Sequence, residues 1–149
     1  MTHESDQVLG RTVLHVEDNA DHADLVRRCL SRHRPESRVV CVEDGEAALE
    51  YLSKNDSASP RPFLILLDLR LPKVDGFEVL RAVKGNPVLA AIPVVVLTTS
   101  DSESDVSSAY EHHANSYLVK PDDFGLLDSM LKDVGDYWLA WNVQPTGAP

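Results

Sequence analysis

The sequence predicts a three-layer α/β domain built on a parallel five-stranded sheet with strand order 2-1-3-4-5. Residues 63–67 form an unbroken apolar run that stops on Asp68, which fits a strand buried on both faces. Further short apolar segments alternate with segments of helical periodicity along the whole chain. Right-handed crossovers between parallel strands leave few other topologies, and this order places the first and third strands side by side.

Five short apolar or β-branched segments predict the strands. In order, they are residues 12–16, 38–42, 63–67, 92–97 and 116–119. Four of them stop on polar side chains, and the second is the exception. A polar loop at residues 53–62 precedes the third strand and is rich in turn-forming residues.

A helix is predicted after each strand. The residues that introduce these helices are Asn19, Asp44, Asp75, Asp101 and Asp123. Asn19 and Asp75 are good N-caps, and Gly85-Asn86-Pro87 ends the third helix. The fourth helix, within residues 101–113, has only a thin apolar stripe, so we expect it to pack partly against the body of the domain.

Length and composition favour one domain. The chain has 149 residues, of which 43% are hydrophobic and 26% are charged. We expect a polar tail at residues 1–10, the domain at residues 11–142 with an extended last helix, and a second tail at residues 143–149. The net charge of −10 argues against a nucleic-acid partner, because proteins that bind the phosphate backbone carry a basic face.

Cysteine usage and hydropathy predict a cytoplasmic location. Cys29 and Cys41 have neither a redox-motif nor a metal-ligand spacing, so we expect two small buried side chains in a reducing compartment. The N-terminus lacks an apolar signal segment, and no stretch approaches the roughly 18 apolar residues of a membrane span. We therefore expect no contact with a membrane.

Polar side chains gather where four predicted strands end. They are Glu17 and Asp18, Asp68, Thr98 and Lys120. Each alone has an ordinary explanation, such as a helix cap, a solvated acid, a β-branched strand residue or a surface ammonium. Because the carboxyl ends of parallel strands share one edge, we expect these side chains to lie together. Grouped carboxylates repel one another unless a cation is present, and their oxygens suit Mg²⁺.

This set of residues suits phosphoryl transfer. The Asp68 carboxylate is placed to form an acyl phosphate, and a metal would neutralise charge on the transferring oxygens. Lys120 would offer a positive charge to a phosphate oxygen, and the Thr98 hydroxyl would offer a hydrogen bond.

Four motifs resemble the receiver domain of two-component response regulators, over residues 12–131. They are V-E-D-N at 16–19, L-L-D-L-R-L-P-K-V-D-G at 66–76, V-V-L-T-T-S at 95–100 and Y-L-V-K-P at 117–121. The resemblance implies a flavodoxin-like (βα)5 fold and a sensor histidine kinase as the partner that phosphorylates Asp68. Such a protein promotes its own phosphorylation and dephosphorylation without being a conventional enzyme.

The resemblance also implies the ligands of Mg²⁺. Asp18, Asp68 and the backbone carbonyl of Arg70 would bind the ion, with Glu17 assisting through water. Glu17 replaces the more frequent Asp of this acidic pair, and metal binding tolerates that replacement.

Phosphate contacts and a switch follow from the same resemblance. Thr98 and the Thr99 amide would contact the phosphoryl group, and Lys120 would pair with it. A cis peptide is implied between Lys120 and Pro121. Thr98 and Tyr117 would form the switch, which would act on the surface of the fourth helix, fifth strand and fifth helix.

Within this family, the chain resembles single-domain regulators paired with bacterial phytochromes. It rests on the long loop at residues 53–62 and the W-L-A-W ending, and we expect no output domain after the last helix. Arg70 and Ser100 occupy positions that tune the lifetime of the phosphoryl group in relatives, so that lifetime stays open.

Other functions remain open. A receiver-like interaction module would work by docking without phosphorylation. A hydrolase with an aspartyl-phosphate intermediate would need an acid at position 70, where this chain has Arg. A nucleotide-binding protein of the same fold would need a phosphate-binding glycine loop, which the sequence lacks.

The last helix predicts a homodimer. Its apolar stripe is longer than the core of such a domain needs, so we expect part of it to be an exposed dimer surface. The stripe consists of Phe124, Leu127, Leu131, Val134, Trp138 and Trp141. The alternative is that both tryptophans fold back onto the same subunit.

Overall fold

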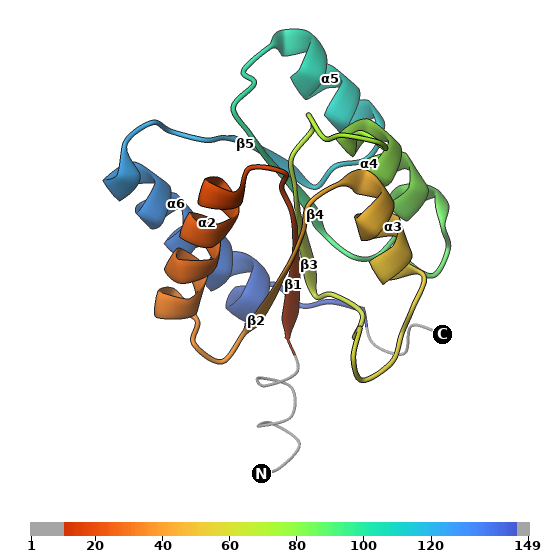
Figure 1. Cartoon of the computed structure of the whole chain (residues 1–149), viewed down its shortest axis with the longest axis horizontal. Helices are drawn as coiled ribbons and strands as arrows, with labels where there is room; N and C mark the ends of the chain where they lie inside the picture. Colours follow the sequence, from red (N-terminus) through yellow and green to blue (C-terminus); the bar gives the residue numbers. More distant parts are fainter. Residues whose placement is uncertain (1–10, 146–149) are drawn as a thin grey trace.

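The computed structural model describes residues 11–145, which form a sheet of five parallel strands (Figure 1). The strands are β1 (Thr12–Val16), β2 (Arg38–Val42), β3 (Leu64–Leu67), β4 (Val94–Thr98) and β5 (Ser116–Val119). Their order is β2-β1-β3-β4-β5, which confirms the predicted topology. The predicted tail at residues 1–10 and the end of the second tail lie outside the described residues.

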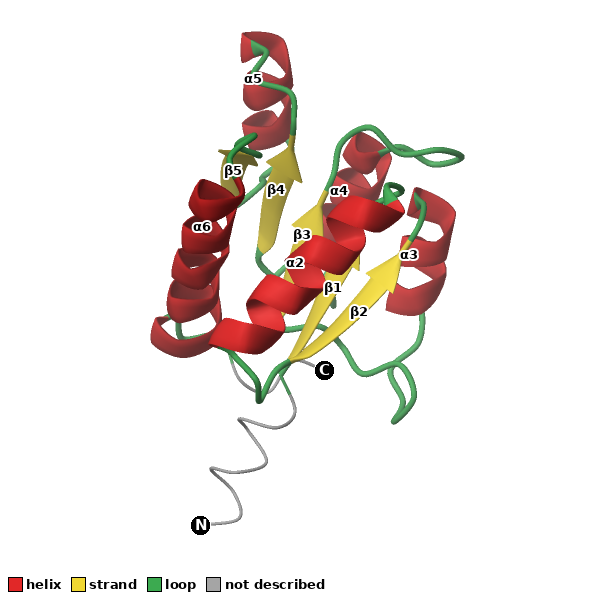
Figure 2. Cartoon of the chain, turned by 60° about the vertical axis from the view of Figure 1, so that its left-hand side comes forward, coloured by secondary structure: helices red, strands yellow, loops and turns green. Residues whose placement is uncertain are grey.

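Helices cover both faces of the sheet. They are α2 (Ala20–His33), α3 (Gly45–Leu52), α4 (Gly76–Gly85), α5 (Glu103–Glu111), α6 (Phe124–Asp136) and the π-helix η1 (Tyr137–Trp141). In Figure 2, α2 and α6 lie in front of the sheet, and α3 and α4 lie behind it. Each α-helix begins at an N-cap whose side chain accepts a backbone N–H, and these caps are Asn19, Asp44, Asp75, Ser102 and Asp123.

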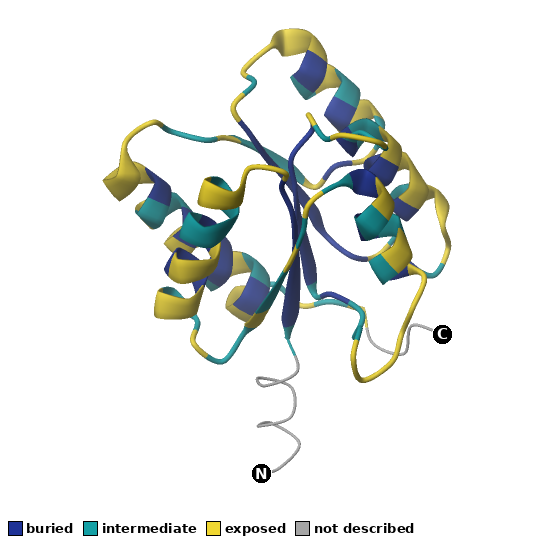
Figure 3. Cartoon of the chain, viewed as in Figure 1, coloured by how far each residue is buried: buried dark blue, intermediate teal, exposed yellow. Residues whose placement is uncertain are grey.

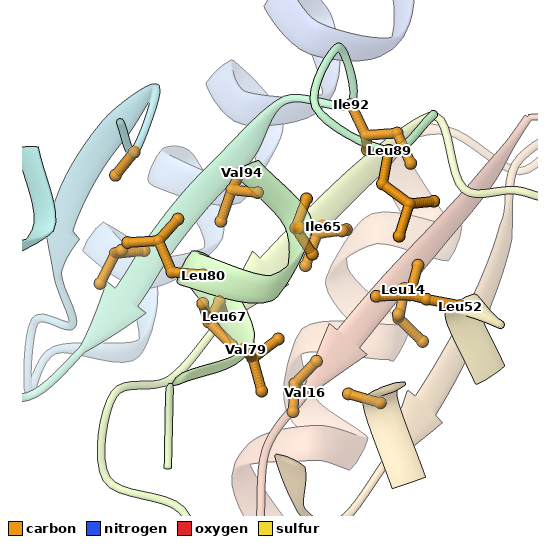
Figure 4. Packing of buried hydrophobic residues seen from close by; sticks show 14 of the residues in the cluster. Leu14, Val16, Leu52, Ile65, Leu67, Val79, Leu80, Leu89, Ile92 and Val94 are labelled. Atoms are coloured by element: carbon orange, nitrogen blue, oxygen red, sulfur yellow. The ribbon is translucent and has the colours of Figure 1, made fainter. Parts of the chain in front are cut away.

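Two apolar clusters lie on opposite faces of the sheet. Ile65 and Leu67 point toward α3 and α4, as the close-up in Figure 4 shows. Leu64 and Leu66 point the other way, toward α2 and α6. The three central strands, β1, β3 and β4, are therefore buried from both sides, whereas the helices expose their outer faces (Figure 3). Burial on both faces explains why the third strand is an unbroken apolar run.

The last helix differs from its prediction. Leu127, Leu131 and Val134 pack into the subunit's own core with α2, so they do not belong to an exposed dimer surface. Trp138 is partly buried against the same cluster. Of the predicted stripe, only Phe124 and Trp141 are exposed, at 53% and 79%. The middle of α6 buries apolar side chains of β4 and β5 on this face of the sheet.

Two smaller expectations were wrong. Cys41 is exposed because it lies on β2, which is an edge strand, whereas Cys29 is buried as expected. The peptide bond between Lys120 and Pro121 is trans, as are all peptide bonds of residues 11–145. The trans form is the lower in free energy for most bonds that precede proline. None of the helices in this described part is long and apolar enough to span a membrane.

Candidate functional site

Backbone pairing brings the predicted site residues to one edge of the sheet. The Asp68 amide donates to the Val16 carbonyl at 3.1 Å, so Asp68 lies beside the end of β1. The Lys120 amide donates to the Thr98 carbonyl at 2.7 Å, which joins the ends of β4 and β5. The arrowheads of the strands in Figure 2 point to this edge. The parallel ladder therefore places side chains from four strand ends around one point.

Asp68 lies at the centre of the site. Its side-chain Oδ1 accepts the Thr98 hydroxyl at 3.1 Å and the Arg70 amide at 3.2 Å. Lys120 Nζ lies 3.5 Å from the other oxygen, Oδ2. Two hydrogen bonds and one ion pair therefore hold the carboxylate, and Asp68 is still 8% exposed to solvent. These contacts hold the carboxylate in one orientation.

Glu17 and Lys120 form a buried ion pair beside Asp68. The Lys120 ammonium donates to Glu17 Oε1, and the two side chains are 6% and 1% exposed. Burial raises the pKa of Glu17, and the hydrogen bond and charge of Lys120 oppose that rise. The ion pair holds the ammonium between the two acids. Lys120 is therefore placed to interact with any charge that develops on Asp68.

The three acids fit a divalent cation. Glu17, Asp18 and Asp68 each offer a carboxylate oxygen, and these oxygens all lie within 4.8 Å of one another. Three carboxylates against the single ammonium of Lys120 leave two uncompensated negative charges if all are ionised. Oxygen ligands at an open edge match the preference of Mg²⁺. Asp18 is exposed, which gives an ion access from solvent.

A second polar group lies at the mouth of the site. The Arg70 guanidinium donates to Asp105 Oδ2 at 2.5 Å, and the Ser100 hydroxyl donates to the same oxygen at 2.6 Å. Tyr117 is partly buried and donates its hydroxyl to the Ser100 carbonyl at 2.8 Å. Sequence reasoning did not single out Asp105. Its spacing of four residues from Ala109 on the apolar stripe of α5 was the available signal.

Two histidines near the site were also missed. His22, on α2, places Nδ1 3.2 Å from Lys120 Nζ. His15 lies inside β1 with 0% exposure, and neither ring nitrogen has a hydrogen-bond partner among the described residues. Burial, with a contribution from Lys120, lowers the pKa of His15 to about 3. The signal for His15 was a titratable side chain within an otherwise apolar strand.

Thr99 lies in the wall of a hollow of about 200 Å³ that Lys120 also lines. The remaining lining residues come from α2, from the segment that joins β5 to α6, and from the beginning of α6. A route therefore leads from solvent to the ammonium next to Asp68. Contacts of the Thr99 amide with a phosphate, and of the Arg70 carbonyl with a metal, stay predictions.

Comparison with known proteins agrees with this geometry. Residues 13–132 match the family described as response regulator receiver domain. The chain belongs to this family. It is 48% identical over 134 residues to the probable methanogenesis regulatory protein FilR2 of Methanothrix harundinacea, a match that covers 89% of this chain and 86% of FilR2. It is 44% identical over 131 residues to the response regulator Rcp1 of Synechocystis, covering 87% of this chain and 89% of Rcp1.

Solved receiver domains share the fold closely. The Mn²⁺-bound form of Rcp1 superimposes with a TM-score of 0.84 at 42% identity, over 91% of this chain and 99% of that structure. The phosphorylated cyanobacterial phytochrome response regulator RcpA gives a TM-score of 0.85 at 38% identity, again over 91% and 99%. This receiver domain therefore resembles regulators of phytochrome signalling in both sequence and structure.

Proposed function

We propose that this receiver domain is a response regulator whose Asp68 accepts a phosphoryl group from a histidine kinase. The observation that carries the proposal is the arrangement around the Asp68 carboxylate. One of its oxygens accepts the Thr98 hydroxyl at 3.1 Å, and the other lies 3.5 Å from the Lys120 ammonium. A nucleophile next to a hydrogen-bond donor and a cation is what transfer of a charged phosphoryl group requires.

In the proposed transfer, a carboxylate oxygen of Asp68 attacks the phosphorus of a phosphohistidine. The oxygen–phosphorus bond forms as the phosphorus–nitrogen bond breaks, and the imidazole leaves with the electron pair and takes a proton. Lys120 and Thr98 stabilise the charge on the transferred oxygens. Mg²⁺ bound by Asp18, Asp68 and the Arg70 carbonyl, with Glu17 nearby, would supply further charge neutralisation.

The hollow beside Lys120 gives the donor its approach. It is lined by polar groups of Lys120, Thr99 and His22 and by apolar side chains of Phe124 and Leu127. A volume of about 200 Å³ accommodates an imidazole side chain, so a kinase histidine could enter from the side of α2. Lys120, which lines this hollow, has its ammonium 3.5 Å from the Asp68 carboxylate.

We further propose that phosphorylation acts on the surface of α5, β5 and α6 through Thr98 and Tyr117. Thr98 contacts the acceptor, and two residues later the Ser100 carbonyl binds the Tyr117 hydroxyl. A shift of Thr98 toward the phosphoryl group would therefore move the residue that holds Tyr117. This coupling follows a short, continuous stretch of backbone from the site to the surface.

The partner proposed here is a sensor histidine kinase, and a bacteriophytochrome is the favoured class. Support comes from the likeness to RcpA, which is described as a phytochrome response regulator. Phosphoryl-transfer assays with a phytochrome kinase, and with an unrelated histidine kinase as the control, would test this class. Equal phosphoryl transfer from both kinases would contradict it.

We also propose a homodimer, now restricted to the exposed ends of the last helix. Phe124 and Leu126 are exposed at its beginning, and Tyr137 and Trp141 are exposed at its end. Aromatic side chains on a surface commonly anchor interfaces. Sedimentation of the wild type beside Phe124→Ser and Trp141→Ser variants tests the proposal. A monomeric wild type at tens of micromolar, where weak dimers normally form, would rule the dimer out.

Labelling with acetyl phosphate and Mg²⁺ tests the central proposal. We expect a base-labile adduct on the wild type, none on Asp68→Asn, and none in excess EDTA. Asp101→Asn is a matched control, because it removes a carboxyl from an exposed residue outside the acidic group. Equal labelling of Asp68→Asn would refute the assignment. A wild type that never labels would favour the alternative of a docking module.

A further inference from the structure

A closed ring of contacts joins the acceptor to the first turn of α5. Thr98 bonds to Asp68 at 3.1 Å, and the Ser100 amide lies 3.5 Å from the Thr98 hydroxyl. The Ser100 hydroxyl then donates to Asp105 at 2.6 Å. Arg70 closes the ring, because its guanidinium binds Asp105 and its amide binds Asp68. The acceptor and Asp105 are thus connected by two separate routes.

Asp105 is a buried acid whose only cationic partner among the described residues is an exposed side chain. Its side chain is 11% exposed, whereas the Arg70 side chain that pairs with it is 64% exposed. The carboxylate is therefore fixed by the fold, and the guanidinium reaches it from the solvent side. Loss of the guanidinium would leave a buried charge with one hydroxyl donor, and such a charge is unfavourable.

The helix that carries Asp105 has few other attachments. Of the residues of α5, only Asp105 and Ala109 are buried. In Figure 3, most of α5 is coloured as exposed or intermediate, unlike the buried strand β4. The contact of Asp105 with Arg70 and Ser100 therefore forms a large share of what holds the first turn of α5 against the domain.

We propose that Asp105 and a phosphoryl group on Asp68 compete for the guanidinium of Arg70, so that Asp105 holds α5 in its resting position until Asp68 is phosphorylated. This inference rests on the proposed function, because it requires phosphorylation of Asp68. Asp105 is a positioning residue, since it contacts Arg70 and Ser100 but no reacting atom.

Charge and geometry favour movement of the Arg70 guanidinium from Asp105 to the phosphoryl group. A phosphoryl group brings about two negative charges and three acceptor oxygens, and the planar guanidinium binds such oxygens in pairs. Arg70 is two residues from the acceptor, and its amide already contacts the carboxylate. Once Arg70 turns to the phosphoryl group, the Asp105 carboxylate is buried without a cationic partner. It can be hydrated only if the first turn of α5 moves toward solvent. Phosphorylation would thereby loosen α5.

Hydrogen exchange of α5 tests the proposal directly. We expect phosphorylation by acetyl phosphate and Mg²⁺ to speed exchange in residues 103–111 several-fold in the wild type. Asp105→Asn should show fast exchange without phosphate and little further change with it, while the exposed control Asp101→Asn should behave as the wild type. Arg70→Gln provides a second variant with an exposed side chain in case Asp105→Asn does not fold.

The lifetime of the acyl phosphate provides a readout that a purely structural role would not change. Asp105→Asn frees Arg70, so it should lengthen the lifetime several-fold in the wild-type background and leave it unchanged in the Arg70→Gln background. Equal effects of Asp105→Asn in both backgrounds would overturn the competition. Normal labelling of Asp68 with unaltered exchange of α5 would also overturn it while the proposed function stands. Absence of any label would overturn both.

Discussion

Replacing His15 by leucine should make the protein less sensitive to acid. His15 is fully buried within β1 and neither ring nitrogen has a partner among the described residues. The pKa of His15 is lowered from 6.5 to about 3, first by burial and then by the charge of Lys120. As the pH falls below 6.5, the unfolded chain binds a proton at this position that the folded chain excludes. Stability that is present above pH 6.5 is therefore lost progressively toward pH 3.

The size of the effect follows from the shift. At pH 5 the unfolded histidine is 1.5 pH units below its ordinary pKa of 6.5, whereas the folded histidine is still neutral. One pKa unit corresponds to about 1.4 kcal/mol, so His15 should lower the free energy of unfolding by about 2 kcal/mol between pH 8 and pH 5. Leucine has no proton to bind, and it suits a fully buried position that lies opposite Leu66 of β3.

Urea unfolding, followed by tryptophan fluorescence at pH 8 and pH 5 in EDTA, measures the difference. We expect the wild type to lose about 2 kcal/mol more than His15→Leu over this range. His113→Asn is the control, because His113 is exposed and asparagine tolerates its positive φ of 71°. The reasoning is refuted if the wild type and His15→Leu lose the same free energy between the two pH values.

Three further substitutions test the packing and the site. In thermal unfolding, Gly76→Ala should destabilise the fold by about 1–3 kcal/mol, because the added Cβ would lie 2.3 Å from the backbone carbonyl oxygen of Asp68. Gly85→Ala is the control, because its Cβ meets no atom within 4 Å, and it should be neutral or stabilising. Leu131→Ala should cost about 2–5 kcal/mol in urea unfolding, and the exposed Leu126→Ala should cost almost nothing. Lys120→Ala should still label but show no phosphorylation-induced shift of the tyrosine NMR signals, and a wild-type shift would contradict its role.

The order of the elements and the position of the acceptor could be predicted from the sequence. Apolar runs and helix caps are local patterns, and they determine where a strand stops. Once the strands are parallel, their carboxyl ends must share an edge, so Asp68, Thr98 and Lys120 come together without knowledge of any distance. The structure agrees with this prediction because backbone pairing alone places these residues.

Only the tertiary structure decided which side chains pack together and which charged side chains pair. The apolar stripe of the last helix predicted an exposed surface, yet Leu131 is buried, because periodicity marks an apolar face without saying what covers it. The pair of Arg70 and Asp105 spans 35 residues, and that of Glu17 and Lys120 spans 103. Such contacts depend on how layers pack and where side chains point, and neither follows from local spacing.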